Sequence, residues 1–118
     1  MTTIKLKRVY DDPEAGDGFR VFVDRLWPRG VKKEALHYDM WAKNIAPSAD
    51  LRKWFHQNTD NNWTEFVARY RAELNLSAAV KDFIATASGY DVVTLLYASK
   101  NATRNHALVL KDFIEEHI

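Results

Sequence analysis

Two arginines and a tryptophan follow an apolar run near the beginning of the chain. The run is Val21–Val23, and Arg25, Trp27 and Arg29 come shortly after it. Arginine is always charged, and its planar guanidinium matches the geometry of carboxylates and phosphates. The segment therefore predicts a pocket for a small anionic molecule, such as a nucleotide or a phosphate ester. Trp27 is expected to contact the apolar part of that ligand.

The same residues also have a purely structural interpretation. Arg25 could pair with Asp24, Asp39 or another acid at the edge of the core, and Arg29 could stack on Trp27 or Trp41. Both tryptophans fall in segments without regular periodicity, so either could instead form the wall of a pocket. If it forms the wall of a pocket, Trp41 is a further predicted ligand-binding residue.

A second group of polar residues follows the apolar run at 92–97. Ser99 and Lys100 come directly after this run, and Asn105 and His106 come a few residues later. Lys100 adds positive charge, and His106 is the candidate for proton transfer because imidazole titrates near neutral pH. Each of these residues also has a structural alternative. Ser99 could be a small residue at a crowded strand exit, Asn105 could cap a helix, and His106 could be a half-buried histidine bonded to backbone or carboxylate.

Both groups are predicted to lie at one edge of a sheet. The segments 20–24 and 92–97 are rich in β-branched and apolar residues, which is typical of buried strands. Pro28 cannot donate to a sheet ladder and Gly30 permits a tight turn, so the first of these strands must end before them. Open α/β sheets bind ligands at the carboxyl ends of their strands. We therefore expect the two groups to converge if the strands are neighbours.

The remaining pattern alternates strands with helices. Residues 32–36 and 39–43 could each form one helical turn. The other predicted elements are a first strand at 4–9 with an exposed face or an edge position, helices capped by Ser48, by Thr59 or Asp60 and by Ser77, and a final helix at about 102–116. This order implies parallel crossovers. It predicts an α/β fold with a small, mainly parallel sheet of three or four strands, flanked by helices.

The composition bounds the class of protein. The 118 residues are 47% hydrophobic and 28% charged, which is typical of one globular domain spanning 1–118. A net charge of +1 gives no electrostatic case for a membrane partner and makes a nucleic-acid partner unlikely. The basic segment 25–33 nevertheless leaves an alternative function open, a non-enzymatic module that binds a protein or a nucleic acid through this face. In a third interpretation these residues only stabilise the irregular region 25–47, and the function lies at an oligomer interface.

No cofactor or metal is predicted. The chain has no cysteine, which excludes thiol catalysis, cysteine-ligated metals and disulfides. His37 and Asp39 form a weak metal-ligand pair, and no other histidine has ligand spacing around them. Gly-rich phosphate loops and the Gly-x-Ser-x-Gly pattern are absent. No signal peptide or membrane-spanning run occurs, so a cytoplasmic location is expected.

Several longer segments resemble one family of small bacterial proteins, the YeaO-like family or domain of unknown function 488. The segments that carry this resemblance are Val23–Gly30, Trp41-x-Lys43-x-Ile45-Ala-Pro-Ser48, Leu51–Phe55, Tyr70–Leu74, and Leu95–Lys100 with Asn105–Ala107. The resemblance spans nearly the whole chain and implies a compact α/β domain in a cytoplasmic bacterial protein. It implies no established reaction.

The chain departs from the family pattern at two places. The family usually continues with Gly/Ser-His-Asp-Pro after Phe55, whereas this chain has the segment 56–60, His-Gln-Asn-Thr-Asp. An acid commonly follows the lysine after the last strand in the family, whereas Asn101 stands here. If that acid does chemistry in the relatives, this chain has lost it. If it only caps a helix, asparagine replaces it equally well.

Overall fold

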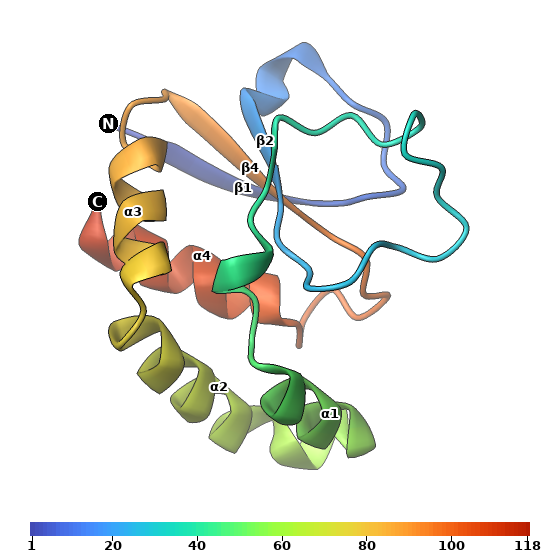
Figure 1. Ribbon diagram of the computed structural model, residues 1–118, viewed down its shortest axis with the longest axis vertical. Helices are drawn as coiled ribbons and strands as arrows, with labels where there is room; N and C mark the ends of the chain where they lie inside the picture. The colour runs from blue at the N-terminus through green and yellow to red at the C-terminus, as the bar shows by residue number, and fades with distance from the viewer.

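The fold is built on a four-stranded parallel sheet with helices on one of its faces (Figure 1). The computed structural model describes residues 1–118. The strands, in the spatial order β1-β4-β2-β3, are β1 (Thr3–Arg8), β4 (Val92–Tyr97), β2 (Phe19–Phe22) and β3 (Met40–Trp41). All neighbouring pairs are parallel. The predicted α/β class and the small parallel sheet are confirmed.

The position of each strand follows from its residues. β4 is apolar along its length apart from Thr94 and lies in the interior of the sheet, where its residues from 93 to 97 are buried. β1 alternates the buried Ile4 with the exposed Lys5, and it lies at an edge, as predicted. Because β2 pairs with β4, the segments that follow these two strands leave the sheet side by side.

The two faces of the sheet are covered differently. Val21 and Leu95 face the main core, which the helices complete. Phe22 and Leu96 face the other way and form a small cluster with Val9 and Leu36, under the irregular segment between β2 and β3. The helices therefore form one layer, and loops cover the opposite face of the sheet.

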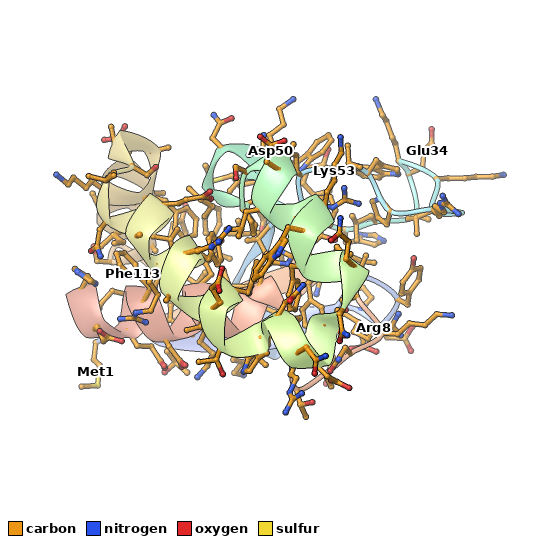
Figure 2. All side chains as sticks on the ribbon, turned by 90° about the horizontal axis from the view of Figure 1, so that it is seen from below. Met1, Arg8, Glu34, Asp50, Lys53 and Phe113 are labelled. Carbon is orange, nitrogen blue, oxygen red and sulfur yellow. The ribbon has the colours of Figure 1, made fainter.

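Four α-helices make up the helical layer. They are α1 (Ala49–Gln57), α2 (Thr59–Asn75), α3 (Ala78–Ala87) and α4 (His106–His117), and two short 3-10 turns lie at Ala15–Asp17 and Lys43–Ile45. α4 packs on β1 and β4, α2 packs on α4, and α1 packs on α2. Figure 2 shows this layer from below, with Asp50 and Lys53 on the side of α1 that faces away from α4. None of the helices combines the length and apolar character needed to cross a bilayer.

Most helix starts agree with the capping signals in the sequence. The predicted caps Ser48 and Ser77 accept hydrogen bonds from the amides of Leu51 and Val80. α2 begins one residue earlier than predicted, because its cap is Asn58.

The start of the last helix and the residues 39–43 were predicted incorrectly. α4 begins at His106, not near 102, because the Asn101 carboxamide accepts hydrogen bonds from the amides of Thr103 and Arg104 and forms a turn. Residues 39–43 form no helical turn. Met40–Trp41 pair with β2 instead, and the Ala42 amide donates to the Phe22 carbonyl at 2.8 Å.

Candidate functional site

A cavity of about 450 Å³ lies at the carboxyl edge of the sheet. Its walls are the segment after β2, the segment after β4, the beginning of α4 and one side of α1. Of the predicted site residues, the structure places seven around this cavity, namely Arg25, Trp27, Arg29, Ser99, Lys100, Asn105 and His106. Parallel pairing of β2 with β4 explains this convergence, since both strands end at the same edge.

Trp41 does not line the cavity. Its indole Nε1 donates to the Asp24 carbonyl at 2.7 Å, and its ring packs on Trp27 with centroids 5.5 Å apart. Trp27 is held in turn by a 2.6 Å hydrogen bond from Nε1 to the Val31 carbonyl. Trp41 thus supports the wall of the cavity from behind, and Trp27 forms part of that wall.

Four cationic side chains around the cavity have no carboxylate partner. This cationic cluster consists of Arg25, Arg29, Arg52 and Lys100. None of them lies within ion-pair distance of an acid. Arg25 is half-buried and donates from Nε to the Pro47 carbonyl at 3.1 Å, so the two terminal nitrogens of its guanidinium remain free. Arg25 therefore lines the cavity with a guanidinium that is held at Nε and has no acid as its partner.

The only carboxylate of the cavity is engaged elsewhere. Asp24 Oδ2 accepts a hydrogen bond from the Ala98 amide at 3.1 Å, and Oδ1 lies 3.0 Å from His106 Nε2. The same Nε2 lies 3.1 Å from the Val23 carbonyl. Because a carbonyl oxygen only accepts, Nε2 carries a hydrogen here, and that hydrogen lies between two acceptors. Oδ1 is buried and receives no hydrogen bond of regular geometry.

The second histidine of the cavity, His56, has a lowered pKa. His56 lies on the exposed side of α1, and its pKa is lowered by partial burial and by the nearby charges of Arg52 and His106. The Asp24 carboxylate acts in the opposite direction but does not compensate. A lowered pKa keeps His56 neutral at physiological pH.

The deep end of the cavity is apolar. Phe55 of α1 and Phe66 of α2 stack with ring centroids 4.0 Å apart, and Ala46 and Pro47 complete this wall. The site therefore combines a cationic side with an apolar side. Such a combination suits a ligand that carries an anionic group on an apolar ring.

Comparison with known proteins identifies the family. Residues 3–118 match the family model described as the inactive DUF488-N3 subclade. The chain belongs to this family. The resemblance inferred from the sequence motifs is therefore confirmed, and the match covers all the elements of the cavity in this DUF488 chain.

The relatives are bacterial proteins that carry no assigned activity in their names. The chain is 47% identical to the uncharacterized protein YeaO of Escherichia coli K12 over 111 residues, which is 94% of this chain and 96% of the relative. It is 39% identical to the uncharacterized protein Rv3073c of Mycobacterium tuberculosis H37Rv over 113 residues, 96% of this chain and 94% of the relative. The uncharacterized protein Mb3100c of Mycobacterium bovis matches equally well. No solved structure shows a significant match.

Neighbouring residues hold the segment after β4 in place in this DUF488 chain. Arg8 at the end of β1 donates from Nε to the Ser99 carbonyl at 3.0 Å and from Nη2 to the Ala98 carbonyl at 3.2 Å. Ser99 Oγ accepts from the Asn101 amide at 3.1 Å. Asn105 is buried, caps α4 through the Leu108 amide and donates to the Asn101 carbonyl. Ser99 and Asn105 thus have local structural partners, and Lys100 is exposed at the edge of the cavity.

Sequence reasoning missed Arg52 and His56, and it did not pair Asp24 with His106. Arg52 and His56 are four residues apart on α1, a spacing that puts them on one side of a helix. That spacing was visible in the sequence. The position of α1 beside the sheet edge was not, because it depends on the packing of α1 against α2.

Proposed function

We propose that this DUF488 chain binds a small anionic metabolite in the cavity, a nucleotide or a phosphate ester, without converting it. The observation that carries the proposal is the half-buried Arg25, which has a fixed guanidinium and no carboxylate partner. A charge removed from water without a counterion costs free energy. An anionic ligand would supply the missing counterion, with Arg29, Arg52 and Lys100 around the same group.

The dimensions and the apolar wall favour a ligand with a ring. A cavity of about 450 Å³ falls within the range of small-molecule sites. Phe55, Phe66 and Trp27 provide apolar surface for a nucleobase or a similar group. A nucleoside monophosphate combines both features and is the ligand that we expect to bind best among simple probes.

Binding without turnover is supported by three observations. The family model that the chain matches is described as an inactive subclade. His106, the candidate for proton transfer, directs Nε2 toward the Val23 carbonyl and Asp24, so this nitrogen is not free for a substrate. Ser99 accepts a hydrogen bond from the Asn101 amide within a turn and has no histidine bonded to it.

A thermal-shift series tests the proposal. The probes are AMP, ribose 5-phosphate and inorganic pyrophosphate, with uncharged adenosine as the control ligand. A probe at a hundred times its dissociation constant stabilises the protein by about 2.7 kcal/mol. For a domain of this size that corresponds to a shift of roughly 10 °C in Tm. We expect the three anions to raise Tm and adenosine to raise it far less.

Matched variants decide whether the cavity is responsible. Arg25→Met keeps the aliphatic stem and removes the charge, and it should weaken AMP binding at least about tenfold. Arg69→Met is the control, because Arg69 lies exposed on α2 and pairs with Glu65. Equal binding by wild type and Arg25→Met would contradict the proposal. Conversion of AMP, followed by chromatography after long incubation, would contradict its non-catalytic part.

The basic segment 25–33 supports the second candidate function, binding of a nucleic acid or a protein. Lys32 and Lys33 are exposed and lie outside the cavity, and Leu26 of the same segment is 57% exposed. If this face binds nucleic acid, Lys32→Met/Lys33→Met weakens the retardation of oligonucleotides in a gel, whereas Arg25→Met leaves it unchanged. A charge-dependent complex should also weaken steeply with added salt.

A further inference from the structure

We infer that His106 is a positioning residue, which holds the Asp24 carboxylate away from Arg25 and thereby keeps the anion site open. This inference rests on the proposed function. It assigns His106 a role through Asp24 and requires no contact between His106 and the ligand.

The starting observation is an ion pair that does not form. Asp24 and Arg25 are adjacent in sequence, and both line the same partly buried cavity. Arginine and carboxylate form strong, charge-assisted hydrogen bonds wherever their geometry allows it. Here the carboxylate pairs with none of the four cations of the cationic cluster. Other groups must therefore hold the Asp24 carboxylate in place of Arg25.

A hydrogen bond to Oδ2 and an ion-pair contact to Oδ1 hold the carboxylate. The Ala98 amide donates to Oδ2 at 3.1 Å, and His106 Nε2 lies 3.0 Å from Oδ1. The Asp24 and His106 side chains are 18% and 17% exposed, so water competes little for this contact. Of the two restraints only His106 is contributed by a side chain.

His106 is itself firmly placed. It is the first residue of α4, directly after the cap Asn105. Its Nε2 also lies 3.1 Å from the Val23 carbonyl, and its ring meets the edge of Tyr70 at a centroid distance of 6.4 Å. Tyr70 is fully buried and donates its hydroxyl to the Ile45 carbonyl at 2.5 Å. The imidazole is thus fixed on several sides and can hold Asp24 in one orientation.

Removal of His106 has a defined consequence. Oδ1 of Asp24 is buried and lacks a hydrogen bond of regular geometry, and without His106 it also loses the Nε2 group 3.0 Å away, which makes its burial less favourable still. Rotation of the carboxylate toward the free terminal nitrogens of Arg25 would give Oδ1 hydrogen-bond donors. The resulting internal ion pair occupies the Arg25 guanidinium, which we propose as the main contact of the anionic ligand. Anion affinity falls although no ligand contact has been deleted.

A double-mutant cycle tests this role. The probe is inorganic pyrophosphate, titrated calorimetrically at pH 8. His106→Ala should weaken binding about five- to tenfold in the wild-type background. In the Asp24→Asn background the same substitution should change binding less than about twofold, because a neutral carboxamide does not compete for Arg25. His106→Gln, which retains a donor for Oδ1, should bind nearly as well as wild type.

The possible results separate the two proposals. Equal losses in both backgrounds would mean that His106 acts on the anion directly and would overturn the inference. No loss in either background would also overturn it and would leave the proposed function standing. Failure of the wild type to bind either pyrophosphate or AMP would overturn both. If His106→Ala does not fold, His106→Leu, which keeps the volume beside Tyr70, is used in the same cycle.

Discussion

Two clusters of charged side chains lie at the two ends of β2, and they are built in opposite ways. At the beginning of the strand Arg20 is buried and forms an ion pair with Asp17, which also accepts from Lys7. Glu14 adds a further contact to Lys7, and these four residues form the paired cluster. Beyond the end of the strand lies the cationic cluster, in which no arginine has an acid.

The local sequences do not explain this difference. Each end has an acid within three positions of an arginine, Asp17 with Arg20 and Asp24 with Arg25. In the paired cluster the acidic loop folds back, so that the Glu14 amide, Lys7 and Arg20 all donate to one carboxylate. Beyond β2 the acid is bound by the segment after β4 and by α4. The first arrangement stabilises the fold, and the second leaves the cationic side chains without a counterion, as the proposed anion site requires.

Breaking the paired cluster should have the largest effect. Asp17→Asn removes the counterion of the buried Arg20 and should lower the free energy of unfolding by about 3 kcal/mol. Urea denaturation at pH 7 measures this change. Glu65→Gln, which removes an exposed ion pair with Arg69, is the control and should change stability by less than about 1 kcal/mol. A loss below about 1 kcal/mol for Asp17→Asn would mean that the two clusters do not differ energetically.

The paired cluster should also produce acid sensitivity. Burial alone raises the pKa of Asp17, but hydrogen bonds from the Glu14 amide, Lys7 and Arg20 outweigh it and leave the pKa below its ordinary value. A carboxyl with a lowered folded-state pKa stabilises the protein above its unfolded-state pKa. This stabilisation is lost as the pH falls below about 4. The difference between wild type and Asp17→Asn in urea denaturation should therefore shrink between pH 5 and about 3. A difference independent of pH would contradict this assignment.

The parts of the fold that were predictable depend on local signals. The apolar run Val92–Tyr97 has one reasonable interpretation, a buried strand, and Ser48 caps its helix through a neighbouring amide. The start of α4 was missed because Asn101 and Asn105 are both good caps, and only the turn formed by Asn101 decides between them. The strand β3 was missed because its two residues are defined by pairing with β2, a contact distant in sequence.

The same distinction applies to the site. Arg25 and Lys100 were placed correctly at the cavity because parallel strands end at a common edge. Trp41 lies outside it because its indole bonds to the Asp24 carbonyl, seventeen positions away in the sequence. Arg52 reaches the cavity only through the packing of α1 on α2. Contacts between elements that are distant in sequence carry no local signal, so the composition of the site was predicted only in part.

Removing a charge from the cationic cluster should cost little stability. In Arg25→Met the protein loses one hydrogen bond to the Pro47 carbonyl but also an unpaired, half-buried charge. We expect the free energy of unfolding to change by less than about 1 kcal/mol in urea. The matched variant Arg20→Met removes the buried cationic partner of Asp17, leaves it only Lys7 as an ion-pair partner, and should lose about 3 kcal/mol. Similar losses in the two variants would show that Arg25 is structural, as the alternative interpretation of the sequence holds.

The smallest effect is expected at the mouth of the cavity. Arg29 is exposed, and the Tyr10 hydroxyl donates to its backbone carbonyl, not to its side chain. Arg29→Met should therefore change the free energy of unfolding by less than about 0.5 kcal/mol. Because an exposed charge is screened, pyrophosphate affinity should fall only about two- to threefold, and less still in high salt. Calorimetric titration of Arg29→Met and of Arg25→Met measures the ratio of their affinities for pyrophosphate. If the two variants lose equal affinity, the anion binds at the rim, and the half-buried guanidinium of Arg25 is not its main contact.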